Sequence, residues 1–238
     1  MRTLSVNHLS REFCTVIFSI ASAAAVTGGM LLPLIAQAQD RDGERVLNVI
    51  EEPRHRPVHI DGDLYLLDVQ LNPGDESYPH LHNAPILTTS ISNGDGPVGG
   101  VVRSNTDYAR ESFTHAISNS GTFQTRIIAF VNFGPALSDL AGDRPAASQG
   151  EPQLENEWFR SFRVELAPGE ATPLRHHHNP AAVVQVSDGL VHVTRVDGIT
   201  QELDSMGDWA WRDAESPFLI RNVGTQPVAV VINEGRRQ

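Results

Sequence analysis

The sequence predicts an all-β protein built from two similar halves. Short runs of apolar or alternating residues follow one another, and clusters of Gly, Pro, Asn and Asp separate them. Strand-sized runs with regular turns are typical of a sandwich or a barrel. A second observation is an internal repeat, in which a turn, a histidine pair and a strand recur in the same order. Two duplicated β domains are the simplest account of both observations.

The first 38 residues are expected to be a signal peptide and not part of the fold. Arg2 and Arg11 precede an apolar run over residues 13–35, and Ala36-Gln37-Ala38 has the small-x-small pattern that signal peptidases cleave. A transmembrane anchor is the alternative, because about 20 apolar residues suffice to cross a bilayer. Two glycines and a proline within the run disfavour that alternative. We therefore expect a periplasmic or secreted bacterial protein with no stable membrane anchor.

The expected strands fall on both sides of a polar connection. They lie at residues 64–71, 86–92 and 123–133 in the first half, and at 159–166, 181–187, 191–196 and 228–232 in the second. Residues 39–135 are expected to form one barrel and residues 156–238 the other. The segment 136–155 is rich in Asp, Ala, Pro, Gly, Ser and Gln and is expected to link them, with one short helix around 138–143.

The repeat is defined by matching landmarks. Those of the first half are Leu71-Asn72-Pro73-Gly74, His80, His82, Gly94 and His115-x3-Asn119-x-Gly121. Those of the second half are Leu166-Ala167-Pro168-Gly169, His176, His178, Gly189 and Phe218-x3-Asn222-x-Gly224. The spacings agree within one residue, which indicates that both halves share one topology.

These landmarks resemble the two motifs of the cupin superfamily, roughly G-x5-H-x-H-x3/4-E-x6-G and G-x5-P-x-G-x2-H-x3-N. The resemblance covers both halves and implies a bicupin, with two tandem cupin-type jelly-roll β-barrels. The sequence departs from the family pattern at three positions. The glutamate position is Leu87 in the first half and Ala182 in the second, and Phe218 stands where the second half would have its later histidine.

The first half contains the main candidate metal site. Because alternate residues of a strand share a face, His80 and His82 point together, and a third imidazole from a distant strand, His115, completes the set. We expect these three residues to hold a divalent transition metal, with Fe(II) favoured and Ni, Mn, Cu or Zn as alternatives. The competing interpretation is three solvated turn histidines in a degenerate barrel.

The second half offers His176 and His178 as a second candidate metal site with only two clear ligands. Gln185 or Glu215 could supply a third donor, but we favour a structural remnant or the lining of an apolar pocket. His177 should point the opposite way and be exposed. His55, His59 and His192 lie outside both motifs, so surface or edge positions are expected for them.

Two further pairs of side chains have both a structural and a functional interpretation. Trp209 and Trp211 share a strand face, and we expect them to line the core, with stacking on a ligand as the alternative. Arg103 and Arg126 are expected to be exposed edge arginines, with capture of a substrate carboxylate as the alternative.

Composition excludes several classes of protein. The chain has 29 acidic residues against 18 basic ones and a net charge of -11, which disfavours binding to nucleic acid or to anionic lipid. All the basic residues are arginines, so no lysine is present for a Schiff base or a phosphate-binding loop. The one cysteine, Cys14, would leave with the signal peptide, so histidine, carboxylate or amide groups must hold any metal.

The resemblance to three-histidine cupin dioxygenases implies an oxidoreductase that acts on a small anionic or chelating organic substrate. Three neutral ligands leave the charge of the ion undiminished, which suits such a substrate. A metal-dependent isomerase or lyase, and a non-catalytic ligand-binding bicupin, are the alternatives. Because cupins commonly pair through strand edges, the resemblance also implies a possible homodimer.

Overall fold

The computed structural model describes residues 45–139 and 150–237, which belong to one compact unit. The described residues form strands and a single 3-10 turn, η1 (Asp107–Ala109), so the expected all-β class is confirmed. None of their helical segments is long and apolar enough to cross a membrane. The expected signal peptide and most of the expected helix at 138–143 lie outside the described residues.

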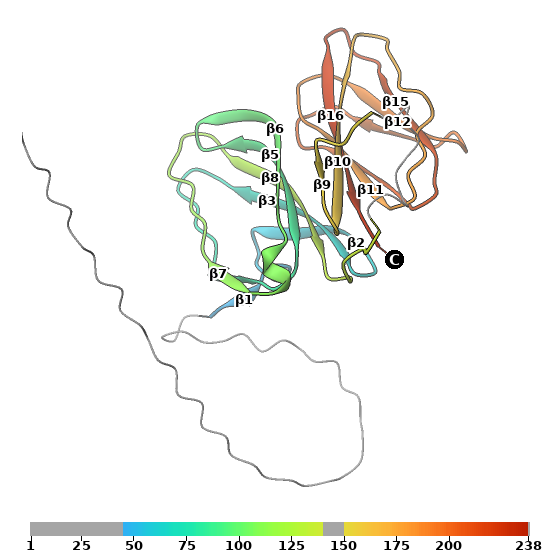
Figure 1. Cartoon of the computed structure of the whole chain (residues 1–238). Coiled ribbons are helices and arrows are strands. Elements are labelled where there is room, and N and C mark those ends of the chain that lie inside the picture. The colour runs from blue at the N-terminus through green and yellow to red at the C-terminus, as the bar shows by residue number, and fades with distance from the viewer. Residues whose placement is uncertain (1–44, 140–149, 238) are drawn as a thin grey trace, which may run out of the picture. The chain divides into compact units, whose positions relative to one another are not determined.

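The first half consists of two sheets, drawn from blue to yellow-green in Figure 1. A five-stranded sheet has the order β2-β3-β8-β5-β6, and a three-stranded sheet has the order β1-β4-β7. The strands are β1 (Leu47–Asn48), β2 (His55–Asp61), β3 (Leu64–Leu71), β4 (His80–His82), β5 (Ile86–Asn93), β6 (Gly96–Asn105), β7 (Phe113–His115) and β8 (Thr125–Asn132).

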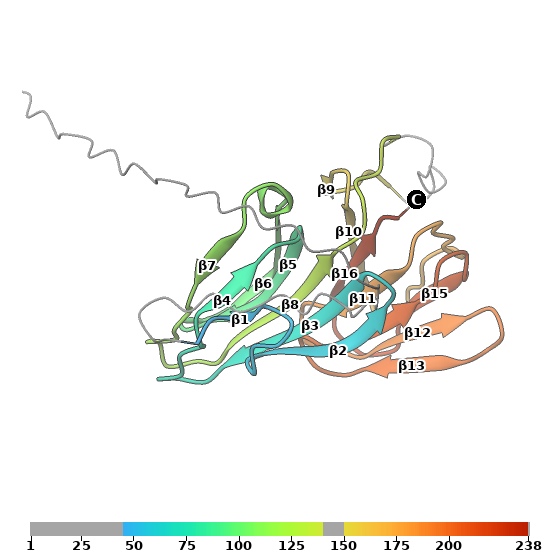
Figure 2. The ribbon, with the colours of Figure 1, turned by 90° about the horizontal axis from the view of Figure 1, so that it is seen from below.

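The second half repeats this arrangement. Its sheets have the orders β14-β11-β16-β10-β9 and β13-β12-β15, and the β12–β13 hairpin is seen in Figure 2. The strands are β9 (Leu154–Glu155), β10 (Phe159–Leu166), β11 (Ala181–Gln185), β12 (Val191–Arg195), β13 (Thr200–Leu203), β14 (Trp209–Arg212), β15 (Phe218–Asn222) and β16 (Val228–Gly235). The exact domain boundaries stay a prediction, and β9, at the end of the expected connection, pairs with β10.

Alternation along each central strand supplies two apolar faces. In β16, Val228, Val230 and Ile232 belong to the core inside the second half. The intervening Ala229 and Val231 belong to a different core, which also contains first-half residues such as Phe130. Both faces of β16 are therefore buried, which explains why its sequence is an almost continuous apolar run.

The two halves are joined through that shared core. It combines outward-facing side chains of β3, β5 and β8 with those of β10, β11 and β16, and Trp209 and Trp211 pack half-buried against it. Polar contacts cross the same junction, since Asn233 Nδ2 donates to Thr89 Oγ1 over 2.8 Å. The expected role of the two tryptophans in core packing is thus confirmed.

In each half, the side chain of one buried asparagine forms hydrogen bonds that connect the end of the repeated segment to its beginning. The Asn119 amide donates to the carbonyls of Leu71 and Phe123, over 2.9 and 2.7 Å. Two residues later, a Cβ on Gly121 would lie 2.1 Å from the Gly94 carbonyl oxygen, so only glycine fits this backbone crossing. Asn222 makes the corresponding bonds to Leu166 and Gln226 in the second half.

Candidate metal centre

The first-half histidines meet because of strand pairing. His80 and His82 are the two inward residues of β4, only 0% and 5% exposed, and β7 places His115 directly opposite His80. One donor nitrogen from each of the three rings lies within 4.8 Å of the others. The alternation argument therefore predicted the geometry correctly, and the exposed-turn interpretation is wrong for His80 and His82.

The orientation of His80 suits a metal ligand. Its Nδ1 lies 2.9 Å from the carbonyl oxygen of Tyr78, so Nδ1 carries the proton and Nε2 keeps its lone pair. His80 Nε2 and His82 Nδ1 are buried nitrogens with no hydrogen-bond partner among the described residues. An unsatisfied buried polar atom costs about 1–3 kcal/mol, which coordination of an ion would offset. These residues fit a divalent transition metal.

Electrostatics keep the three imidazoles neutral. Burial lowers the pKa of His82 to about 3, with further lowering from neighbouring His80 and His115. Burial also lowers the pKa of His80 and of His115. Since only an unprotonated ring nitrogen can bind a metal, this cluster is ready to bind one at neutral pH.

A fourth histidine, His55, lies beside this cluster, contrary to the expected surface position. It is buried at the start of β2, and its ring centroid lies 4.2 Å from that of His80. Burial lowers the pKa of His55 to about 4, although its hydrogen bond to Glu52 acts in the opposite direction. The spacing of Glu52 and His55 allows their hydrogen bond, but no local pattern indicates that His55 contacts His80.

Glu52 links His55 to the backbone that orients His80. One carboxylate oxygen lies 2.6 Å from His55 Nδ1, and the other accepts the N–H of Tyr78 over 3.1 Å. The carbonyl of the same Tyr78 receives the proton of His80 Nδ1. Outer partners of this kind fix the tautomer and direction of metal-binding histidines. Glu52 is therefore a positioning residue for the cluster.

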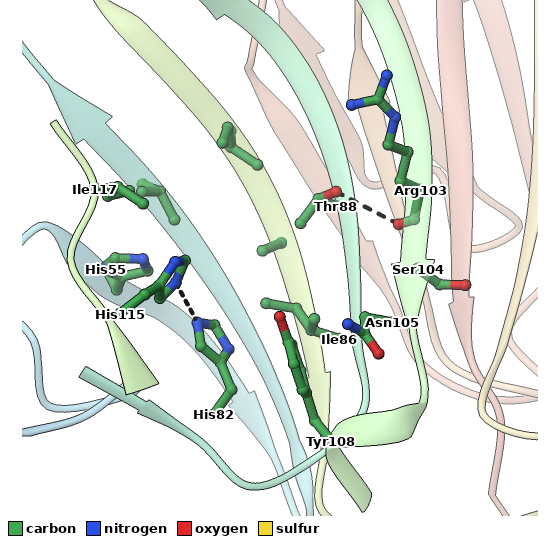
Figure 3. A pocket seen from close by; sticks show the side chains of 13 residues that line it. His55, His82, Ile86, Thr88, Arg103, Ser104, Asn105, Tyr108, His115 and Ile117 are labelled. Atoms are coloured by element: carbon green, nitrogen blue, oxygen red, sulfur yellow. Dashed lines mark hydrogen bonds between the residues drawn. The ribbon is translucent and has the colours of Figure 1, made fainter. Parts of the chain in front are cut away.

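His55, His82 and His115 line a cavity of about 320 Å³ in the first half, and His80 is buried behind them. The side wall of the cavity is apolar and includes Val69, Ile86, Ile117, Ile127 and Ala129. In Figure 3, His55, His82 and His115 gather on one side of the cavity, while polar groups of β5, β6 and η1 stand across from them. Those groups are Thr88, Arg103, Asn105 and Tyr108.

Arg103 is exposed on the edge strand β6, as expected, and it also lines this cavity. It pairs with Thr88 across β5 and β6, and both side chains share the inward face with Ile86. Arg126 differs, because its guanidinium is bound to Asp68 and to the carbonyl of Met206. It is half-buried and not an exposed edge arginine.

The expected glutamate position needs correction. Leu87 faces the core shared by the two halves, not the histidines. Its neighbour Ile86 is the inward residue and lines the cavity. Strand parity explains the error, since a shift of one residue moves a side chain to the opposite face. The inward position is apolar, so this strand supplies no carboxylate to the cluster.

Strand register also corrects the assignment in the second half. His80 pairs with His115 in the first half, and the corresponding bridge in the second joins Arg175 to Phe218. The side chains of His176 and His178 are 45% exposed, so the expectation that they line an apolar pocket is wrong. The inner positions of the second half are instead Arg175, His177 and Phe218.

The inner positions of the second half are filled by a charged network. His177 is 2% exposed, so its expected exposure is wrong, and its Nδ1 contacts the buried carboxylate of Glu234. The same carboxylate lies 3.2 Å from Nη1 of Arg160, whose Nε lies 2.7 Å from Glu155. Phe218 is fully buried in the core of the second half.

The remaining candidates lie away from both inner sites. His59 is half-buried and packs its ring 4.1 Å from that of Trp211. His192 is half-buried, with its Nε2 3.0 Å from Glu202, and it lies on the central strand β12, so it is not at a sheet edge. Gln185 is buried and donates to the carbonyls of Ser187 and Gly189, so its amide nitrogen is engaged away from the histidines.

No family model matches the sequence, and no curated protein matches it at a significant level. Among solved structures, AerE from Microcystis aeruginosa has a TM-score of 0.53 at 11% identity, over 78% of this chain and 99% of that chain. A mutant salicylate 1,2-dioxygenase from Pseudoaminobacter salicylatoxidans has a TM-score of 0.51 at 12% identity, over 74% of this chain and 72% of that chain. A cupin 2 conserved barrel domain protein from Leptotrichia buccalis has a TM-score of 0.46 at 10% identity, over 76% of this chain and 88% of that chain. At these identities the likeness is one of fold.

Proposed function

We propose that this chain, a bicupin by its fold, is a metal-dependent oxidoreductase of the dioxygenase type. Its first barrel would hold Fe(II) through His80, His82 and His115 and act on a small anionic or chelating organic substrate. The observation that carries this proposal is the convergence of three neutral imidazoles, with an unpartnered buried Nε2 on His80, beside an apolar cavity that His82 and His115 line. The similar fold of a salicylate 1,2-dioxygenase supports the choice of reaction class.

The cavity supplies binding groups for such a substrate. Arg103 stands across from the histidines and can receive a carboxylate, with Thr88 and Asn105 on the same face for further hydrogen bonds. The ring of Tyr108 is stacked on that of His82, with 5.0 Å between the ring centroids, and it also lines the cavity. The apolar wall can accommodate a hydrophobic body. The expected substrate is thus a small carboxylate with an apolar or aromatic part.

Bound Fe(II) would supply the coordination sites at which the substrate and dioxygen meet. The protein would supply a hydrogen-bonding group beside them. With Nδ1–H donated to Glu52, Nε2 of His55 is the basic nitrogen, and its low pKa keeps it neutral at pH 7. His55 lines the cavity and, as a neutral ring, could accept a hydrogen bond from a substrate hydroxyl through Nε2.

Oxygen consumption tests the proposal. Protein reconstituted anaerobically with Fe(II) is mixed with hydroxybenzoates, diketones, flavonols and thiols, and oxygen uptake is recorded. We expect uptake with at least one class and none above background for His80→Ala/His82→Ala. Substrate turnover without oxygen uptake would instead indicate the isomerase or lyase alternative. Tight substrate binding with no turnover would indicate the non-catalytic alternative, which the apolar Ile86 at the inward position favours.

The export of the chain is also a proposal. Cleavage after Ala38 would release a protein without cysteine into the periplasm or the medium. Expression of the full sequence in a bacterium, followed by cell fractionation and N-terminal sequencing, provides the test. A periplasmic product that begins at Gln39 is expected, and an uncleaved cytoplasmic product would contradict the proposal.

A further inference from the structure

The outer surface of the second half carries a cluster of two histidines and a carboxylate. His176 Nε2 lies 2.7 Å from Glu215 Oε2, and His178 Nδ1 lies 2.6 Å from Glu215 Oε1. One donor atom from each of the three residues lies within 4.8 Å of the others. The cluster lies outside the barrel, because Arg175 and His177 occupy the buried positions of this segment.

The backbone holds the three side chains together. Glu215 lies in the turn between β14 and β15, and its N–H donates to the carbonyl of His177 over 3.0 Å. Its φ of 59° is left-handed, and no other described non-glycine residue has a positive φ. Such a conformation in a residue other than glycine is costly and persists only where its surroundings fix it. The turn places the carboxylate within contact of both imidazoles.

The donor types in this cluster also match a metal site. Two imidazoles and one carboxylate are a common protein ligand set for zinc, which takes one or two waters in its open positions. The side chains are 45% to 57% exposed, so an ion in solution can reach them.

We infer that His176, His178 and Glu215 bind a Zn²⁺-type ion on the outside of the second half. The bound ion would cross-link the 175–178 segment to the turn between β14 and β15. This site is independent of the first-half cluster in position, ligand set and exposure. It goes beyond the proposed dioxygenase function and does not require it.

Calorimetric titration with Zn²⁺ tests the inference in a protein that lacks the first site. In His80→Ala/His82→Ala we expect one ion per chain, together with a rise in melting temperature, because the ion binds the folded state. Adding His178→Ala/Glu215→Gln should abolish both effects. His192→Ala/Glu202→Gln removes an exposed histidine–glutamate pair that lacks a third ligand, and it should leave both effects unchanged.

Two results would overturn the inference. One is the absence of Zn²⁺ binding to His80→Ala/His82→Ala, and the other is binding that survives His178→Ala/Glu215→Gln. Circular dichroism checks that each variant is folded. If the His80→Ala/His82→Ala protein does not fold, the number of zinc ions bound is compared between the wild type and His178→Ala/Glu215→Gln. A loss of one ion then supports the site, and an unchanged number refutes it.

Discussion

The two halves share a backbone plan but fill its inner positions with opposite chemistry. Where the first half places His80, His82 and His115, the second places Arg175, His177 and Phe218. The first set is neutral, and His82 and His115 line a cavity, whereas His177 contacts the buried carboxylate of Glu234. The strand partner of Ile86 on β8 is Val131, and the corresponding partner of Ala181 on β16 is Glu234. A single scaffold can thus either gather three imidazoles or pair a histidine with a buried carboxylate.

The largest expected effect on stability tests whether the network of the second half is structural. Glu234→Gln removes the negative charge between Arg160 and His177, both buried. Breaking a buried ion pair costs about 3–5 kcal/mol, and we expect about 3 here because Arg160 keeps Glu155. Urea denaturation measures the change. Glu165→Gln, which removes an exposed partner of Arg163, should stay within about 0.5 kcal/mol.

A smaller effect, on metal affinity, is expected at the positioning residue of the first half. Glu52→Gln weakens the hydrogen bonds of this side chain to His55 and to the N–H of Tyr78. Outer partners of this kind contribute about 10–100-fold to metal affinity, so the Fe(II) dissociation constant should rise by about that factor. Competition with a chelating dye measures the Fe(II) dissociation constant. An unchanged constant would show that Glu52 only stabilises the fold. Glu76→Gln, in the neighbouring turn, serves as the matched variant and should bind Fe(II) normally.

Arg103→Gln should act on the substrate and not on the metal. Loss of a charged hydrogen bond costs about 1.5–3 kcal/mol, so the KM for a carboxylate substrate should rise roughly ten- to a hundredfold. The kcat and the Fe(II) content should change little. Steady-state kinetics make this separation, and a neutral ester of the same substrate should lose the dependence on Arg103. Equal KM values for variant and wild type would remove Arg103 from the binding site.

The smallest effect concerns pH in the metal-free protein. The pKa of His82 falls from 6.5 to about 3 on folding, so the unfolded chain binds more protons between these values. Its contribution to stability is therefore fully present above pH 6.5 and is lost as the pH falls toward 3. Between pH 7 and pH 5 the free energy of unfolding should fall by about 1–2 kcal/mol more in wild type than in His82→Gln. Parallel urea curves at the two pH values provide the measurement.

Much of this arrangement could be predicted from sequence. The strands at 64–71 and 159–166 begin and end as the hydrophobic pattern indicates. The inward pairing of His80 and His82 follows from the two-residue period of a strand. These features depend on the local alternation of apolar and polar residues and on the neighbouring turns, and consecutive residues determine both.

The register of the second half could not be predicted in the same way. The segment 175–178 has three consecutive histidines, so each face of an extended chain carries at least one. The sequence pattern alone therefore does not show which of these side chains point into the barrel. The bridge between Arg175 and Phe218 decides it, and that contact spans distant residues. His55 and Glu52 were missed for a related reason, since only tertiary packing brings this turn against β4.

Metal binding by a protein with only the first site tests the central claim most directly. In His178→Ala/Glu215→Gln, anaerobic dialysis against Fe(II) should leave one ion per chain, and X-ray absorption at the iron edge should show imidazole scattering from histidine ligands. Adding His80→Ala/His82→Ala should remove both the ion and that signal. Iron that stays bound after this change, or a folded first-site protein that binds none, would contradict the account.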